Sequence, residues 1–152
     1  MTRGRCGSLG GMAHVNDPAV IRRLLTSRGT WAVVGLSTNR ARAAYGVAAY
    51  LQGLGQAVVP VHPRAETVHG AAGVRTVAEA VAAAGRVDVV DVFVNSALAG
   101  DVVDQAVAAG AGAVWLQLGV VDEDAAARAA AAGLDVVMDA CPAIEGRRLG
   151  LG

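Results

Sequence analysis

The chain has 152 residues, a length that fits one ordinary domain with a single core. Its hydrophobic content of 54% comes mostly from Ala and Val, and no apolar run approaches the roughly 20 residues that cross a bilayer, so we expect no membrane-spanning segment. Because 13 basic residues balance 13 acidic ones and no basic run occurs, the composition argues against a nucleic-acid-binding protein.

The N-terminal segment MTRGRCGSLGG is rich in glycine and has no hydrophobic periodicity. We expect residues 1–11 to form a disordered leader and residues 12–152 to form one domain. The two cysteines, Cys6 and Cys141, are too few for a disulfide framework, and the N-terminus has no signal-type apolar stretch. These features favour a cytoplasmic protein.

Valine-rich runs alternate with alanine-rich amphipathic stretches along the rest of the chain, which is the pattern of repeated βαβ units. Asn16 or Asp17 can cap a first helix that ends near Gly29. Further helices are predicted at 43–54, 77–84, 99–109 and 123–132, and strands at 31–35, 56–61, 87–94, 113–119 and 134–141. This order predicts an α/β fold, a Rossmann-like open parallel sheet of five or six strands with helices on both faces.

The stretch AVVGLSTNRARAAYGVAAYL, residues 32–51, predicts a strand, a glycine turn and a helix whose N-terminus can hold a phosphate. Only Gly35 stands in register with the dinucleotide fingerprint G-x-G-x-x-G. Arg40 and Arg42 follow in the same loop, and Arg64 comes after the second strand, where an NAD site carries an acidic residue. Three cations near one helix N-terminus indicate a ligand with several phosphates, such as an adenosine 3′-phosphate 5′-diphosphate group.

All strand-to-helix turns of such a sheet lie at one edge, so the turns GLSTNRAR, PVHPR, FVNSALAG, LGVVDED and DACPAIE are predicted to converge on one crevice. Asp88 and Asp91 are three residues apart on one strand and face opposite sides, which excludes a paired-carboxylate acid–base site there. The sequence contains no metal-ligand motif, so no metal is expected.

Several blocks of the sequence, AVVGLS, VVPVHPR, VDVVDVFV, AVWLQLGV and GLDVVMDACPAIE, resemble the small stand-alone CoA-binding domain proteins. That family is similar to the CoA-binding N-terminal domain of the succinyl-CoA synthetase alpha subunit. The resemblance extends from about Asp17 to Glu145 in the same order and spacing. The family commonly has Asn at the position of His62, and Arg at the positions of Val94 and Ala140.

The resemblance implies that coenzyme A lies across the carboxyl edge of the sheet. Its phosphates would lie near the first loop and Arg42, its adenine beside the PVHP turn, and its pantetheine arm past residues 94–96. The candidate contact residues on these loops and on the WLQLG block are Gly35, Leu36, Ser37, Arg40, Arg42, Pro60, His62, Pro63, Arg64, Val94, Asn95, Ser96, Gln117 and Gly119.

We predict a non-catalytic binding or regulatory module for coenzyme A or an acyl-CoA, because no motif supplies a nucleophile, a base and an orienting group together. Two alternatives stay open: a minimal NADP-binding oxidoreductase or redox sensor, in which Arg64 holds the 2′-phosphate, and a CoA-binding subunit of a larger ligase-type assembly. The missing loop glycines argue against the first. The expected partner is a small nucleotide ligand, with neither nucleic acid nor membrane, and a protein partner or homodimer stays open.

Overall fold

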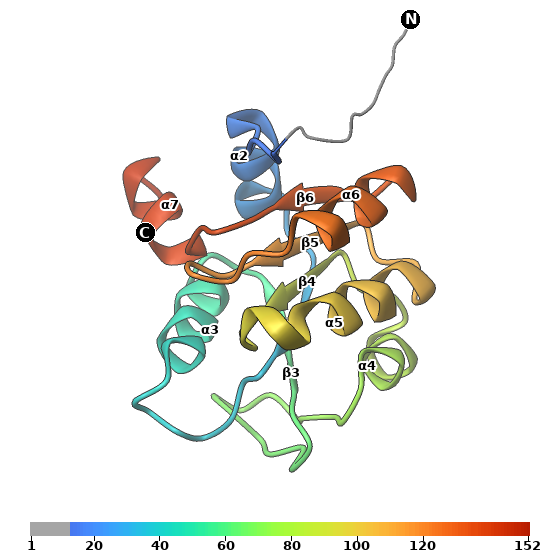
Figure 1. The fold of residues 1–152 in the computed structure, drawn as a ribbon. Helices are drawn as coiled ribbons and strands as arrows, with labels where there is room; N and C mark the ends of the chain where they lie inside the picture. Colours follow the sequence, from blue (N-terminus) through green and yellow to red (C-terminus); the bar gives the residue numbers. More distant parts are fainter. Residues whose placement is uncertain (1–12) are drawn as a thin grey trace, which may run out of the picture.

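The computed structural model describes residues 13–152, so the expected leader at residues 1–11 lies outside the described residues (Figure 1). The described part forms one sheet of parallel strands in the order β3-β2-β4-β5-β6. The strands are β2 (Thr30–Val34), β3 (Ala57–Val61), β4 (Val89–Val92), β5 (Ala113–Leu116) and β6 (Asp135–Val137). The predicted Rossmann-like parallel sheet is therefore confirmed, with five strands.

Helices cover both faces of this sheet (Figure 1). One face carries α2 (Pro18–Thr26), α3 (Ala43–Gly53) and α7 (Pro142–Arg148), and the other carries α4 (Val77–Ala84), α5 (Ser96–Ala108) and α6 (Glu123–Ala131). The helix α2 starts as predicted, because the Asp17 carboxylate accepts a hydrogen bond from the N–H of Ala19 and Pro18 occupies the first turn.

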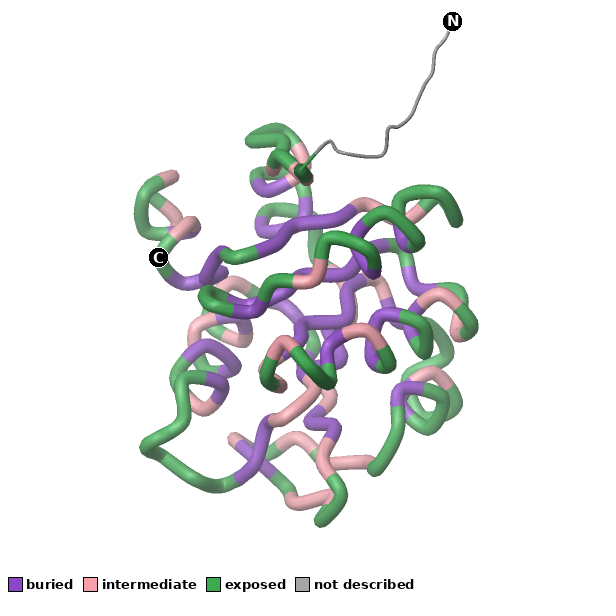
Figure 2. Tube along the Cα trace, viewed as in Figure 1, coloured by how far each residue is buried: buried purple, intermediate pink, exposed green. Residues whose placement is uncertain are grey.

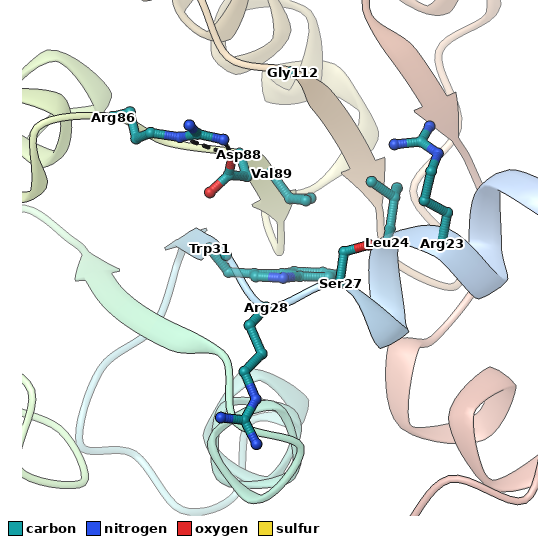
Figure 3. A pocket seen from close by; sticks show the side chains of 10 residues that line it. Arg23, Leu24, Ser27, Arg28, Trp31, Arg86, Asp88, Val89 and Gly112 are labelled. Carbon is teal, nitrogen blue, oxygen red and sulfur yellow. Dashed lines mark hydrogen bonds and ion pairs between the residues drawn. The ribbon is translucent and has the colours of Figure 1, made fainter.

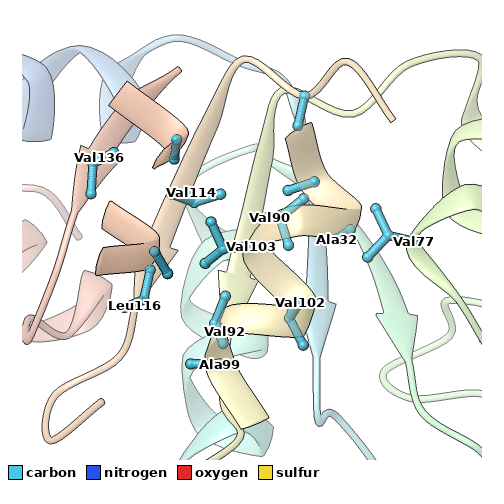
Figure 4. Close-up of a cluster of buried hydrophobic side chains, with 14 of the residues drawn as sticks. Ala32, Val77, Val90, Val92, Ala99, Val102, Val103, Val114, Leu116 and Val136 are labelled. Atoms are coloured by element: carbon cyan, nitrogen blue, oxygen red, sulfur yellow. The ribbon is translucent and has the colours of Figure 1, made fainter. Parts of the chain in front are cut away.

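The central strand β4 shows why the valine-rich runs form strands buried on both faces. Val90 and Val92 point toward α5 and pack with Val103 (Figure 4), whereas Val89 faces the other layer of helices. Figure 2 shows the result as a buried sheet between helices whose outer surfaces are exposed. On the face that carries α2, α3 and α7, the rings of Trp31 and Trp115 pack with centroids 5.6 Å apart.

Several predicted boundaries are wrong, and the strand β4 covers Val89–Val92 in place of the predicted 87–94. The helix α5 begins at Ser96 and not at Ala99, and the strands β5 and β6 end before residues 117–119 and 138–141. Both strands end early because the chain turns: Gly119 has a φ of +85° and Asp139 a φ of +57°. The short helix α7 was not predicted.

The carboxyl of Asp91 is buried in the sheet without a hydrogen-bond partner for either oxygen among the described residues. Asp91 alternates with Val90 and Val92, so it shares the face of Val89, on which the buried cluster consists of hydrophobic residues. Burial raises the pKa of this carboxyl well above its usual value of 3.8.

This raised pKa predicts a pH-dependent loss of stability. Below pH 3.8 the carboxyl is protonated in both states, and above it the unfolded chain releases a proton that the folded protein retains. The free energy of unfolding therefore falls as the pH rises from 3.8 toward the folded-state pKa. In urea titrations at several pH values, Asp91→Asn should lack this contribution.

Asp91→Val provides the matched apolar variant and should raise the free energy of unfolding at neutral pH by about 1–3 kcal/mol, because it removes an unpartnered polar group from the core. The informative quantity is the difference between wild type and Asp91→Asn, since other carboxyls titrate equally in both proteins. A difference that does not change with pH would contradict the prediction.

Candidate functional site

A cleft of about 850 Å³ opens at the carboxyl ends of β2, β3, β4 and β5. The strand order reverses between β2 and β4, and open α/β sheets bind ligands at this switch point. Gly35 lies at the reversal with a φ of +100°, and a Cβ there would stand 2.7 Å from the carbonyl oxygen of Phe93. The ends of β2 and β4 approach this closely because residue 35 has no side chain.

Two helices have uncapped N-termini at this cleft. The helices α4 and α6 are capped, because Thr76 accepts a hydrogen bond from the N–H of Glu79 and Asp122 accepts one from Ala125. In contrast, the N-cap residues of α3 and α5 are Arg42 and Asn95, which make no side-chain cap hydrogen bond and both line the cleft. At α3 the free N–H groups, the helix dipole and the charge of Arg42 therefore favour an anion at the switch point, whereas the free N–H groups of α5 offer donors without an added cation.

The loop between β2 and α3 is held by its own side chains. The Ser37 hydroxyl accepts a hydrogen bond from the N–H of Asn39 at 3.2 Å, and the Asn39 side chain accepts one from the N–H of Ala41 at 3.0 Å. Ser37 and Asn39 also line the cleft. These two polar residues thus shape the loop as well as face the ligand site.

The carboxylate of Glu66, in the segment that follows β3, binds the same loop at Thr38. Glu66 accepts hydrogen bonds from the backbone N–H and the hydroxyl of Thr38, at 3.1 and 3.2 Å. The bond from the Thr38 backbone is the main cause that lowers the pKa of Glu66. Glu66 also pairs with the guanidinium of Arg64 at 3.4 Å.

The charges along the cleft are separated. Arg42, Arg64 and Arg75 line the half formed by the N-terminus of α3 and the end of β3, together with His62. The other half, formed by β4, β5 and α5, is lined mainly by apolar and uncharged polar residues: Val94, Asn95, Leu98, Val102, Gln105, Gln117, Leu118 and Val120, with Asp101 as its charged residue. The cleft therefore suits a ligand with an anionic end and a neutral end.

The neutral half contains a polar group that lacks a partner. Gln117 is 7% exposed, and its side-chain oxygen makes no hydrogen bond within the described part of the chain. Leu98 and Leu118 beside the same half are 53% and 57% exposed. A ligand segment that combines apolar groups with an N–H donor would cover both leucines and satisfy Gln117.

His62 takes over a turn contact that an asparagine can make. Its Nδ1 accepts a hydrogen bond from the N–H of Arg64 at 3.1 Å, two residues later. An Asn side chain makes the same contact in an Asx-turn. His62 therefore supports the local turn through its ring, which also forms part of the wall of the cleft.

The structure brings most of the predicted contact residues to one place. The cleft is lined by Gly35, Ser37, Arg42, His62, Pro63, Arg64, Val94, Asn95 and Gln117. The other five do not line it. Leu36 and Pro60 are buried, and Arg40 packs over the ring of Tyr45 with its guanidinium carbon 5.9 Å from the ring centroid.

The last two residues of that set, Ser96 and Gly119, contact each other. The Ser96 hydroxyl lies 3.4 Å from the carbonyl oxygen of Gly119 and accepts a hydrogen bond from the N–H of Val121 at 3.0 Å. The N–H of Gly119 donates to the Asp139 carboxylate at 2.7 Å. These bonds hold the β5–α6 loop, whose first residues include Gln117 at the cleft.

Only four of the five predicted turns converge on the cleft. The turn at residues 139–145 does not line it, because Cys141 and Ala143 pack into the core beside α3. Sequence reasoning also missed Arg75, Leu98 and Leu118. Leu98 lies in the first turn of α5, which begins earlier than predicted, and the place of Arg75 depends on a long-range pairing with β3.

A second pocket of about 230 Å³ lies at the opposite edge of the sheet (Figure 3). Arg23, Arg28 and Arg86 line it, but Arg23 is paired with Asp135 and Arg86 with Asp88. The three guanidinium groups point in different directions in Figure 3, so they do not form a common anion site.

Within residues 13–152, no group of three or more His, Cys, Asp or Glu side chains is placed to hold a metal ion. No helix in the same part of the chain has the length and apolar character needed to cross a membrane.

Comparisons with known proteins give the relatives of this chain. The sequence profile of a CoA binding domain family matches residues 29–147. The protein YneT of Bacillus subtilis is 32% identical over 123 residues, which cover 81% of this chain and 89% of that protein. A solved structure from Pyrococcus horikoshii is 34% identical with a TM-score of 0.80, covering 88% of this chain and 92% of that one.

Another solved structure, from Thermus thermophilus, is 30% identical with a TM-score of 0.77 and covers 88% of this chain and 98% of that chain. An acetyl-coenzyme A synthetase of Ca. Korarchaeum cryptofilum shares the fold alone, with 22% identity and a TM-score of 0.65 over 78% of this chain and 28% of that chain.

Proposed function

Because the chain belongs to the CoA-binding domain family, we propose that the cleft at the switch point binds coenzyme A or an acyl-CoA, and that the protein is a non-catalytic binding or regulatory module. The separation of charge along the cleft carries this proposal. Coenzyme A has the same division, with phosphates on its nucleotide and an uncharged arm that contains two amides. A volume of about 850 Å³ lies within the usual range for small-molecule sites.

The anionic part of the ligand fits the basic half of the cleft. Arg42 and the free N–H groups of α3 can bind the diphosphate together, because both attract the same anion. The adenine would lie beside the turn at His62 and Pro63, which lines the cleft next to the end of β3.

The pantetheine arm fits the other half. Its amide N–H can donate to the buried oxygen of Gln117, and its methylene and methyl groups can cover Leu98 and Leu118. Among the described residues, no serine, cysteine or histidine lines this half of the cleft, so it offers no nucleophile paired with a histidine base, which is why we propose binding without catalysis.

Titration calorimetry with a series of ligands tests the proposal. We expect coenzyme A to bind more tightly than NADP or NAD, because the first loop offers Arg42, Ser37 and Asn39 in place of a glycine cradle. Adenosine 3′,5′-bisphosphate, which lacks the arm, should bind more weakly than coenzyme A. Equal or tighter binding of NADP would favour the oxidoreductase or redox-sensor alternative and contradict the proposal.

A further inference from the structure

Arg75 reaches the cleft through a short segment that pairs with the end of β3. Val74 bridges to Val61 in parallel: its N–H donates to the carbonyl oxygen of Pro60 at 2.9 Å, and its own carbonyl accepts from the N–H of His62 at 3.0 Å. The preceding Gly73 permits this course, because a Cβ there would stand 2.3 Å from the carbonyl oxygen of Glu66. Residue 75 is thereby placed beside the carboxyl end of β3.

The start of α4 fixes the backbone of Arg75. The Glu79 carboxylate accepts a hydrogen bond from the N–H of Arg75 at 2.8 Å, while the Thr76 hydroxyl accepts one from the N–H of Glu79 at 3.1 Å. This reciprocal pair resembles a capping box. The Glu79 carboxylate is thus bonded to the backbone of Arg75 and not to its side chain. The guanidinium of Arg75 forms no ion pair within residues 13–152.

The three arginines of the cleft therefore differ in whether an acidic side chain pairs with them. Arg64 shares its charge with Glu66, 3.4 Å away. Arg42 and Arg75 have no ion pair in the described part of the chain, and they stand on different elements, one at the N-terminus of α3 and the other beside the end of β3. Two separate unpaired cations suit a ligand with two separate anionic groups.

We propose that Arg75 binds the 3′-phosphate on the adenosine ribose and so sets a preference of the cleft for coenzyme A over dephospho-coenzyme A. This inference rests on the proposed function, in which the diphosphate lies at Arg42 and α3. In this architecture an arginine beyond the end of the second strand accommodates an extra phosphate on the ribose, and Arg75 stands at that end.

Calorimetric titration of coenzyme A and of dephospho-coenzyme A into wild type and Arg75→Gln tests the assignment. Wild type should prefer coenzyme A by roughly tenfold to a hundredfold, the factor typical of one charge-assisted contact, and Arg75→Gln should bind the two ligands about equally. Arg75→Lys keeps the positive charge and should retain part of the preference.

Two further variants serve as controls. Arg42→Ala should bind both ligands more weakly but keep the wild-type preference, because it acts on the diphosphate. Arg22→Gln removes the same charge from the exposed surface of α2, away from the cleft, and should bind as wild type does. Circular dichroism and thermal melting should show that Arg75→Gln is folded as wild type is.

The outcomes separate this inference from the proposed function. If wild type prefers coenzyme A and Arg75→Gln keeps that preference, the 3′-phosphate is bound elsewhere and the assignment of Arg75 is overturned while the proposed function stands. Strong binding without any preference in wild type also overturns the assignment alone. If wild type binds neither ligand, both the proposed function and this inference fail.

Discussion

Replacing Gly35 by alanine is expected to lower the free energy of unfolding by about 2–5 kcal/mol and to remove ligand binding. A φ of +100° is unfavourable for a residue with a side chain, and the added Cβ would stand 2.7 Å from the carbonyl oxygen of Phe93. Because this carbonyl belongs to the backbone after β4, relief requires β2 and β4 to separate at the mouth of the cleft. Chemical denaturation and calorimetry measure the two effects.

Gly46→Ala is the matched control. Gly46 lies in the exposed middle of α3, and a Cβ there would meet no atom within 4 Å. Alanine is a better helix former than glycine, so this variant should be more stable than wild type by about 0.5–1 kcal/mol. A Gly35→Ala protein as stable as wild type would show that the carboxyl ends of β2 and β4 can move apart at little cost.

The fold could be predicted from the sequence because local signals and burial agree. The run VDVVDVFV has too little polar character for a strand with a solvent face, and the structure buries all four residues of β4. The cap at Asp122 and the glycine after α6 likewise fix that helix within one residue of the prediction. Elements of this kind can be predicted without knowledge of distant contacts.

The carboxyl ends of β5 and β6 could not be predicted in the same way. Residues 117–119, Gln-Leu-Gly, follow β5 without a clear stop signal before Gly119, but the chain turns there and the N–H of Gly119 donates to Asp139, which lies 20 residues later. Asp139 itself has a left-handed φ of +57°, which its residue type tolerates better than most but does not require. Contacts between distant loops therefore decide where these strands end.

Contacts of this kind also decide which of the predicted site residues face the cleft. The position of Ser96 at the sheet edge predicts a ligand contact, but its hydroxyl forms hydrogen bonds with the β5–α6 loop. Arg40 lies in the phosphate loop by sequence and packs over Tyr45 instead. Arg75 lies outside every predicted turn and yet lines the cleft. Position along the chain predicts the loop, and side-chain contacts decide which residues of it face the cleft.

The net charge also conceals the electrostatics of the site. The formal net charge of zero gives no indication of an anionic ligand. Folding nevertheless places Arg42, Arg64 and Arg75 in one half of the cleft, while Asp101 stands in the other half. The division of charge within one site, more than the total charge, supports a nucleotide with an uncharged arm.

Arg42→Ala is expected to weaken the binding of coenzyme A by about tenfold to a hundredfold, since it removes one charge-assisted contact of about 1.5–3 kcal/mol. Arg42 is the N-cap residue of α3 and lines the cleft, so its guanidinium and the first N–H groups of the helix attract the same anion. The stability of the free protein should change little, because a cation at a helix N-terminus opposes the helix dipole when no anion is bound. Calorimetry and thermal melting measure the two quantities.

Dephospho-coenzyme A distinguishes which phosphate Arg42 binds. If Arg42 binds the diphosphate, wild type and Arg42→Ala should lose similar factors in affinity when the 3′-phosphate is removed, because the two contacts are independent. A variant that no longer responds to that phosphate would place Arg42 at the 3′ position and reverse the roles of Arg42 and Arg75. Unchanged affinity for coenzyme A in Arg42→Ala would mean that Arg42 is a solvated surface residue, and the free N–H groups of α3 would then have to hold the diphosphate without it.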